Sequence, residues 1–117
     1  KNNWKTWNLE KNPNLIQDLV SKNKTVLLDI TADWCITCQY NKINVLNDKD
    51  IKKIIKKHDV ILLQLDWTKK NLNIKNFLIS KNRYGIPYNE IYNSKFKNGL
   101  LLPELLNKKQ LINLLSQ

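Results

Sequence analysis

The chain has 117 residues, of which 42% are hydrophobic and 26% are charged, and it carries a formal net charge of +10. This length and composition predict one globular domain with a single core, and they exclude a disordered or fibrous chain. No run of about 18 or more apolar residues occurs, so the sequence contains no candidate membrane span. We interpret residues 1–24 as an N-terminal strand or arm with a first helix, and residues 25–117 as the body of the same domain.

The start of the sequence indicates a piece of a longer protein. It begins Lys1-Asn2-Asn3-Trp4, and the whole chain contains no methionine. No apolar segment follows Lys1, so these residues do not form a secretory signal. We therefore expect a mature fragment, or a domain excised from a parent protein that carries membrane segments outside this sequence.

The positive charge comes almost entirely from lysine. The lysines are spread along the chain, with one denser run at residues 52–57, and Arg83 is the single arginine. Arginine is the side chain that most often contacts bases and phosphates, whereas lysine runs usually coat solvent-exposed helix faces. We therefore expect no nucleic-acid partner, although the charge would attract acidic partners or an anionic membrane surface.

Strands and helices alternate along the chain. Hydrophobic periodicity and capping residues predict strands at residues 4–9, 25–31, 60–65, 90–92 and 99–102, and helices at residues 13–20, 35–45, 48–57, 72–81 and from 107 onward. Strands separated by helices imply parallel pairing, and the last two strands imply an antiparallel hairpin. The predicted fold class is α/β, with a central mixed sheet flanked by helices.

The segment from Trp34 to Cys38 contains both cysteines of the chain. It follows the buried strand at residues 25–31 and begins the next helix, so the two thiols lie one helical turn apart and can bridge. A helix N-terminus favours the thiolate form of Cys35, which makes Cys35 the nucleophile and Cys38 the resolving cysteine. Trp34 would cover one side of this site and offer an apolar platform to a bound substrate.

The two residues between the cysteines influence the direction of electron flow. Ile36 and Thr37 bring neither a positive charge nor an imidazole close to Cys35. A less stabilised thiolate makes a less oxidising disulfide. We therefore expect a reductant rather than an oxidase.

Asp29 is an acidic residue inside the buried strand, six residues before Cys35. Burial there would raise its pKa and prepare it to take the proton from Cys38. A partly solvated acid at the end of the strand is the alternative interpretation.

Pro87 follows Gly85 and Ile86 between a predicted helix and an edge strand. An X-Pro bond in such a place is a candidate for the cis form, and an ordinary trans proline remains the alternative. A cis proline set against Cys35 would leave the backbone of Ile86 free to pair with a substrate segment.

Other kinds of site are poorly supported by the sequence. A structural zinc site needs four ligands, but the chain offers two cysteines and only His58, which we expect at the surface of a lysine-rich helix. A purely structural disulfide would close a very short loop and constrain little. The two glycines, Gly85 and Gly99, exclude a glycine-rich phosphate loop. We expect no metal and no cofactor besides a redox-active Cys35–Cys38 disulfide.

These residues resemble a known family. Residues 28–38, Leu-Asp-Ile-Thr-Ala-Asp-Trp-Cys-Ile-Thr-Cys, resemble the active-site segment of the thioredoxin superfamily. The form Ala-Asp-Trp-Cys-x-x-Cys is most similar to the C-terminal periplasmic domain of the DsbD family of thiol:disulfide interchange proteins. Residues 64–68, 84–87 and 101–106 also resemble that domain, at a strand end, a cis-proline loop and a late Leu-Pro-Glu segment respectively.

The resemblance implies a thioredoxin-like fold and an electron relay. The domain would accept electrons from a membrane-embedded dithiol and pass them to periplasmic thiol/disulfide partners, as a monomeric soluble domain of an inner-membrane protein. The resemblance also makes Pro87 cis and gives Asp29 the proton-transfer role. One departure is Lys42, which stands where relatives often carry an acid, so that any effect of this acid on the pKa of Cys35 is missing.

Two other functions remain open at this point. One is a stand-alone thioredoxin-like reductase, for example one that serves cytochrome c maturation. The other is a non-catalytic basic binding module in which the Cys-x-x-Cys pair is incidental.

Overall fold

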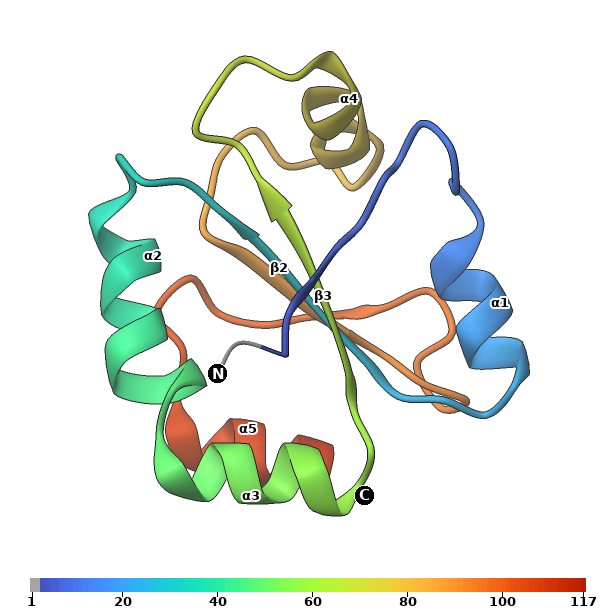
Figure 1. Ribbon diagram of the computed structural model, residues 1–117, viewed down its shortest axis with the longest axis vertical. Helices are drawn as coiled ribbons and strands as arrows, with labels where there is room; N and C mark the ends of the chain where they lie inside the picture. The colour runs from blue at the N-terminus through green and yellow to red at the C-terminus, as the bar shows by residue number, and fades with distance from the viewer. Residues whose placement is uncertain (1–2) are drawn as a thin grey trace.

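The computed structural model describes residues 3–117 (Figure 1). Along the chain the elements are β1 (Lys5–Thr6), α1 (Leu15–Ser21), β2 (Val26–Thr31), α2 (Ile36–Asn41), the π-helical turn η1 (Lys42–Leu46), α3 (Lys49–Lys57), β3 (Ile61–Asp66), α4 (Leu72–Ser80), β4 (Tyr88–Tyr92), β5 (Leu100–Leu101) and α5 (Lys108–Leu115). Within residues 3–117, no helix has the length and apolar character needed to cross a bilayer.

The strands form one five-stranded sheet in the order β1-β3-β2-β4-β5. β1, β3 and β2 run parallel, whereas β4 is antiparallel to β2 and β5 is antiparallel to β4. The predicted α/β class with a central mixed sheet is confirmed, and so is the antiparallel hairpin of the last two strands. The prediction that each strand after a helix pairs in parallel is wrong for β4, which is antiparallel to β2. The reason is that α4 lies beyond the carboxyl end of β3 (Figure 1), so the chain re-enters the sheet at that end, where Tyr88 pairs with Ile30.

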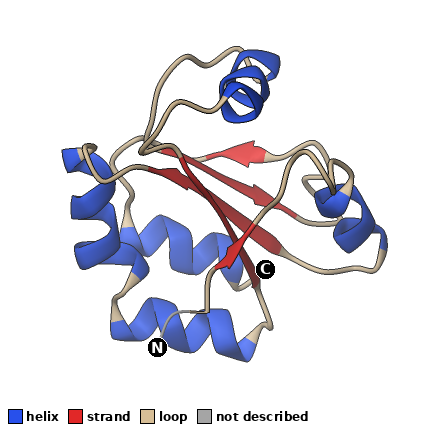
Figure 2. Cartoon of the chain, turned by 45° about the horizontal axis from the view of Figure 1, so that its top comes forward, coloured by secondary structure: helices blue, strands red, loops and turns tan. Residues whose placement is uncertain are grey.

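Helices cover both faces of the sheet (Figure 2). One face packs against α1 and α4 around Val26, Leu28 and Ile30, and the other packs against η1, α3 and α5 around Leu27. Side chains alternate along a strand, so β2 contributes to both cores, and all six of its residues are buried. This central strand carries Asp29 and leads directly into the cysteine pair.

Asparagine and aspartate end three of the helices. Asn23, Asp59 and Asn82 follow α1, α3 and α4 with φ angles of 62°, 55° and 60°. After glycine, these two residue types tolerate the left-handed conformation best, which suits a chain with only two glycines. The starts of α3, α4 and α5 are capped by the side chains of Asp48, Asn71 and Asn107, which accept backbone N–H groups of the first turn.

Two predicted helices differ from the observed ones. The first begins at Leu15 rather than Pro13, because the carbonyl of Asn12 accepts the Trp7 indole N–H (2.9 Å) and the Leu15 backbone N–H (3.3 Å), which holds this segment in a turn. The helix after the cysteines changes to a π-helical turn at Lys42. This wider turn lets the consecutive residues Val45 and Leu46 both be buried.

The N-terminal arm crosses the edge of the sheet at β1 and places one tryptophan on each side. Trp7 is buried in the core under α1 and α4, where its ring meets Phe77 edge to face with 5.6 Å between centroids. Trp4 packs against the core on the opposite face. The observed strand β1 is shorter than the strand predicted at residues 4–9, because the chain turns at Asn8 after two paired residues.

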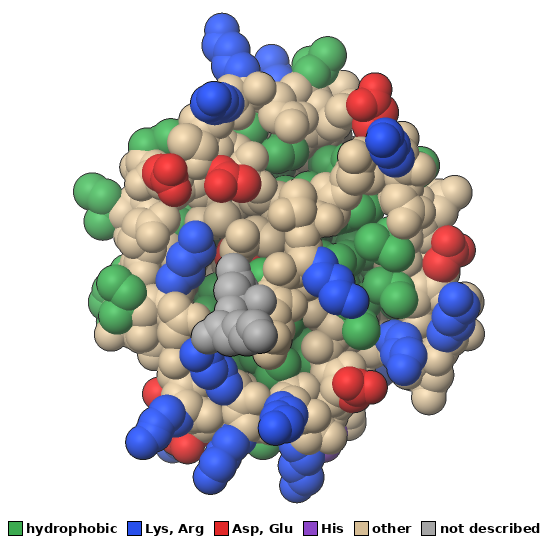
Figure 3. Space-filling view, in the orientation of Figure 1, with side chains coloured by type: hydrophobic (Ala, Val, Ile, Leu, Met, Phe, Trp, Pro, Cys, Tyr) green, Lys and Arg blue, Asp and Glu red, His purple; other side chains and the backbone are tan. Residues whose placement is uncertain are grey.

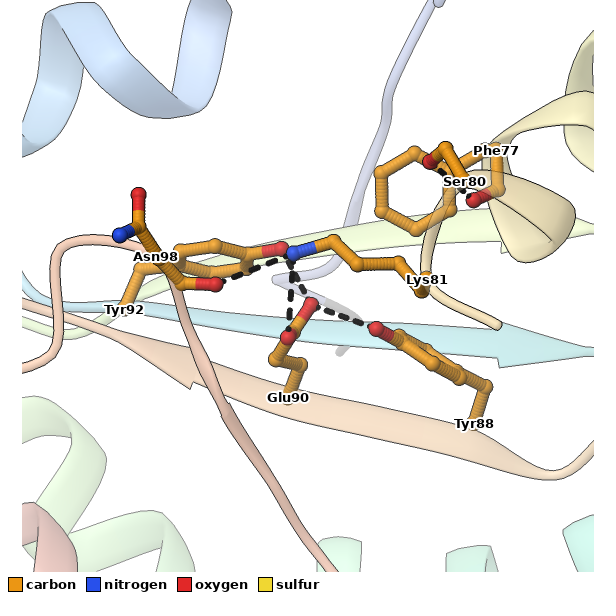
Figure 4. A network of polar contacts seen from close by, with 7 residues as sticks. All are labelled: Phe77, Ser80, Lys81, Tyr88, Glu90, Tyr92 and Asn98. Atoms are coloured by element: carbon orange, nitrogen blue, oxygen red, sulfur yellow. Dashed lines mark hydrogen bonds and ion pairs between the residues drawn. The ribbon is translucent and has the colours of Figure 1, made fainter. Parts of the chain in front are cut away.

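A buried polar cluster lies at β4, beneath α4 (Figure 4). The carboxylate of Glu90, which is 3% exposed, accepts hydrogen bonds from the hydroxyls of Tyr88 (2.8 Å) and Tyr92 and from the Lys81 ammonium (3.3 Å). Burial and the adjacent Glu90 carboxylate raise the pKa of both tyrosines, so their hydroxyls remain donors. Lys81 also donates to the carbonyl of Asn98, and this joins the end of α4 to the turn before β5.

Candidate active site

The cysteine pair lies just beyond the carboxyl end of β2, at the start of α2. Cys35 is the N-cap of this helix, with φ −95° and ψ 101°, and its sulfur accepts the backbone N–H of Cys38 at 3.2 Å. The two cysteines form a disulfide with 5.2 Å between their Cα atoms. Cys35 is 6% exposed and Cys38 is 2% exposed, so Cys38 is the more enclosed of the two.

The position of Cys35 is suited to a thiolate. The unpaired N–H groups of the first helical turn carry partial positive charge, and one of them already contacts the Cys35 sulfur. After reduction of the disulfide, the same groups would stabilise a negative charge on that sulfur more than on Cys38. The sequence-based assignment of Cys35 as the attacking thiol stays a prediction, and the position at the helix N-terminus is compatible with it.

The turn that carries Trp34 is held by the segment after β3. The Trp34 indole N–H donates to the carbonyl of Thr68 (3.2 Å), and the Thr68 hydroxyl accepts the Asp33 backbone N–H (2.9 Å). This hydroxyl in turn donates to the carboxylate of Asp66. Sequence reasoning did not identify Thr68 as part of the site, although it lies in one of the segments that resemble the family. Trp34 is 60% exposed and presents an apolar surface beside the disulfide.

The loop before β4 lies against the cysteine pair. The Ile86–Pro87 peptide bond is cis. Ile86 packs against a small buried cluster formed by Ala32, Cys35 and Cys38. The structure therefore brings the proline loop and the cysteine pair together from distant parts of the sequence.

Asp29 occupies the middle of a polar row that runs across three strands. Gln64 on β3 and Asn89 on β4 are its register partners, and their side-chain amides donate to its two carboxylate oxygens at 3.3 Å and 2.8 Å. Asp29 is 3% exposed, and this burial raises the pKa of its carboxyl group. The amides of Asn89 and Gln64 and the charge of Lys42 oppose the rise in pKa, but they do not cancel it.

A surface groove connects Asp29 with solvent. Asp29, Lys42 and Gln64 all line it, together with residues of the N-terminal arm, η1 and α3. Within residues 3–117, the carboxylate of Asp29 receives its side-chain hydrogen bonds from the two amides and not from a cysteine. Asp29 thus lies on the face of the sheet that η1 and α3 cover, at the wall of this groove.

One feature of the sequence could have identified Gln64 as a partner of Asp29, but none could have identified Asn89. Gln64 is the only polar residue in the apolar run from Val60 to Leu65, just as Asp29 interrupts the run before it. Two interrupted strands that pair in parallel place their polar residues opposite each other. Asn89 offers no such signal, because its strand mixes polar and apolar residues without clear alternation.

Metal ligands do not cluster in the part of the chain that the structure describes. No group of three or more histidine, cysteine, aspartate or glutamate side chains there could hold an ion. His58 is exposed at the C-terminal end of α3, at the surface position expected for it.

Comparison with known proteins gives consistent matches. The family model described as "Thioredoxin-like" matches residues 9–94. The thiol:disulfide interchange protein DsbD of Pasteurella multocida is 32% identical over 74 residues, which are 62% of this chain and 12% of that protein. DsbD of Vibrio cholerae is 28% identical over 88 residues, which are 75% of this chain and 14% of that protein. The chain therefore spans only about a seventh or less of the length of these relatives.

Solved structures agree on the fold. The reduced C-terminal domain of DsbD from Neisseria meningitidis superimposes with a TM-score of 0.73 at 19% identity, covering 97% of this chain and 98% of that domain. Its oxidised form gives a TM-score of 0.71, covering 92% of both chains, again at 19% identity. A thioredoxin from Thermus thermophilus gives 0.68 at 12% identity, covering 99% of this chain and 87% of that one. At these identities the likeness concerns the fold alone.

Proposed function

Because the chain belongs to the thioredoxin-like family, we propose that it is a thiol:disulfide oxidoreductase that works through Cys35 and Cys38. The observation that carries this proposal is the disulfide between the N-cap of α2 and the next helical turn, in contact with Ile86 of the cis-proline loop. A purely structural bridge would not require this position at a helix N-terminus beside an exposed tryptophan.

The first step is attack by the reduced protein on a substrate disulfide. The Cys35 thiolate, stabilised by the first-turn N–H groups, attacks one sulfur of the substrate. A mixed disulfide forms between Cys35 and the substrate, and one substrate thiolate leaves. Trp34 and the loop at Ile86 and Pro87 would hold the substrate segment during this exchange.

The second step releases the substrate. Cys38 loses its proton and attacks the Cys35 sulfur, the Cys35–Cys38 disulfide forms again, and the second substrate thiolate leaves with the electron pair. Asp29 would receive the Cys38 proton, because burial raises the pKa of its carboxyl group and makes its carboxylate a stronger base. The groove at Lys42 and Gln64 would then let this proton reach solvent.

The resemblance to DsbD suggests the direction and the place of this chemistry. The proteins that match are named thiol:disulfide interchange proteins. We propose that the domain passes electrons from a membrane-embedded dithiol donor to periplasmic disulfide proteins, as a soluble domain of an inner-membrane protein. A stand-alone reductase would use the same chemistry, and a longer gene that encodes upstream transmembrane helices would separate the two.

Disulfide reduction with variants tests the proposal. Wild type should reduce insulin disulfides in the presence of dithiothreitol, Cys35→Ala should not, and Cys38→Ala should accumulate a covalent adduct through Cys35. Asp29→Asn should still form the mixed disulfide but should resolve it about 100-fold more slowly. Equal insulin reduction by wild type and Cys35→Ala would rule the mechanism out. A reduction potential of about −120 mV, typical of strong oxidants, would rule out the proposal that the protein acts as a reductant.

A further inference from the structure

A second hollow lies beside the active site, against α4, and the proposed function does not use it. It encloses about 570 Å³ and is lined by the apolar side chains of Trp67, Leu72, Ile79 and Tyr84, among others. Leu72 is 68% exposed and Tyr84 is 80% exposed, so two large apolar side chains stand at its rim in water. Apolar side chains that gather at an exposed hollow are typical of a binding surface.

The charge around this hollow has one sign. Lys70, Lys75 and Arg83 line it, and no acidic residue does. The whole segment from residue 67 to residue 85 contains four lysines and the single arginine of the chain, but no aspartate or glutamate. Figure 3 shows lysine or arginine side chains beside hydrophobic ones at the top of the molecule, where Figure 1 places α4.

Two segments of the chain connect the lining of the hollow to the active site. Trp67 precedes Thr68, whose carbonyl and hydroxyl hold the turn of Asp33 and Trp34. Tyr84 is two residues before Ile86, which contacts the cysteine pair. A polypeptide that reacts at Cys35 would therefore meet segments that also line the hollow.

From this arrangement we propose that the hollow along α4 binds a segment of the redox partner that carries acidic side chains around one large apolar side chain. The apolar side chain enters between Leu72, Ile79 and Tyr84, and the acidic ones pair with Lys70, Lys75 and Arg83. Arginine binds a carboxylate with two parallel hydrogen bonds, so Arg83 contributes orientation as well as charge. This inference rests on the proposed exchange at Cys35 and specifies which partners that exchange favours.

Competition between peptides tests the proposal on the full chain. Three synthetic peptides would share one disulfide loop and differ only in a tail with a central phenylalanine, flanked by glutamate, serine or lysine. The rate constant for reduction of each peptide by the reduced protein would be divided by that for the neutral hydroxyethyl disulfide. We expect the glutamate peptide to exceed the lysine peptide by roughly tenfold at low ionic strength, and by less in high salt.

Charge reversal locates the effect. Lys70→Glu/Lys75→Glu/Arg83→Glu should reverse the preference for the glutamate peptide. The matched control, Lys49→Glu/Lys53→Glu/Lys57→Glu on α3, changes the net charge equally at exposed positions and should retain the preference. Ile79→Ser should lower the rates for all three peptides relative to hydroxyethyl disulfide, because it removes the apolar contact. An equal preference in the α4 and α3 variants, or rates unaffected by Ile79→Ser, would overturn the proposal.

Two further outcomes separate this inference from its premise. If wild type reduces hydroxyethyl disulfide through Cys35 but does not discriminate among the peptides, the hollow is not a partner site, while the proposed function stands. If Cys35→Ala reduces hydroxyethyl disulfide as fast as wild type, the proposed function fails instead. Concentration-dependent dimerisation that Ile79→Ser abolishes would assign the hollow to a second copy of the chain and would also overturn the proposal.

Discussion

At the scale of single residues, Asp29 combines burial with two donated hydrogen bonds. The amides of Asn89 and Gln64 stabilise its charged form, whereas loss of water destabilises it, and the loss of water dominates. The result is a carboxyl group whose pKa is raised but which remains held in one orientation. An acid of this kind can accept a proton from a thiol without losing its place, as the proposed resolution step requires.

Substitution of Asp29 should therefore change how stability depends on pH. The folded protein keeps this proton at pH values where an unfolded chain, with a carboxyl pKa of about 4, has lost it. Stability should fall as the pH rises from about 4 through the raised pKa, and then level off. Asp29→Asn removes this dependence on pH. The Gln64 side chain can rotate so that its amide oxygen accepts a hydrogen bond from the amide nitrogen of the introduced asparagine. We expect the variant to be more stable than wild type at neutral pH, by on the order of 1 kcal/mol.

Urea unfolding at a series of pH values measures this difference. Asp33→Asn, in the exposed turn before Trp34, is the control that removes one negative charge without removing a buried one. Subtraction of each variant's curve from wild type cancels the other carboxyl groups. Parallel curves for wild type and Asp29→Asn would contradict a raised pKa.

Gly99 is required by both its backbone and its neighbour. Its φ angle is 93°, and a Cβ atom added there would overlap the carboxylate of Glu90, which binds Tyr88, Tyr92 and Lys81. Gly99→Ala should lower the free energy of unfolding by about 2 kcal/mol or more, because it strains the backbone and displaces that carboxylate. Gly85→Ala is the matched control, since open space surrounds its added Cβ, and we expect a change within about 0.5 kcal/mol. Thermal or urea unfolding of both variants measures the difference, and equal losses would contradict this explanation.

At the scale of elements, α2 is tied to the segment that precedes α5. The Asn41 side chain, 1% exposed, donates to the Glu104 carbonyl (2.8 Å) and accepts the Leu106 backbone N–H (3.1 Å). Asn41→Leu would leave both backbone groups without these partners, so we expect a loss of about 2–4 kcal/mol. Faster hydrogen exchange of the Leu106 amide would locate the loss. Asn44→Leu, at an exposed position in η1, should leave both the stability and that exchange rate close to wild type.

The order and type of the elements could be predicted from the sequence because local signals agreed. Asp48, Asn71 and Asn107 mark helix starts, and the short runs rich in leucine and β-branched residues that form β2 and β3 favour buried strands. The same local signals predicted Cys35 at a helix N-terminus. The cysteine position was therefore predictable from a few neighbouring residues.

Features that depend on distant contacts were not predictable. The direction of β4 follows from where α4 lies, and α4 is positioned by packing against β2 and β4 side chains rather than by its own sequence. Thr68 and Asn89 join the site through hydrogen bonds that span 35 and 60 positions of the chain. The π-helical turn at Lys42 likewise depends on burial of Val45 and Leu46 against other elements. A single sequence contains no local record of such contacts.

At the scale of the whole molecule, the net charge of +10 should oppose folding. Like charges approach one another when the chain becomes compact, and α3 concentrates five of them within Lys49–Lys57. Lysine side chains also gather along the lower edge of the view in Figure 3, where Figure 1 places α3. Lys108 already pairs with Asp48 and Asp50 there, which shows how acidic groups offset the excess.

Relief of this repulsion should stabilise the protein. Lys53 lies four residues from both Lys49 and Lys57, an arrangement in which like charges on a helix disfavour each other. Lys53→Glu converts both unfavourable pairs into favourable ones, so we expect a gain of about 0.5 kcal/mol in the free energy of unfolding at low ionic strength. Urea unfolding at several salt concentrations measures both the gain and its decline with screening.

Removal of the Lys53 charge should stabilise the protein less than reversal of that charge. Lys53→Gln removes the repulsion without adding an attraction, so its stability at low salt should lie between those of wild type and Lys53→Glu. Wild type should gain the most from added salt, and Lys53→Glu the least, because screening weakens repulsion and attraction alike. If all three proteins responded equally to salt, the positive charge of α3 would have no part in stability. Selection of acidic partners by the lysines and arginine around α4 would then be the main physical consequence of the charge excess.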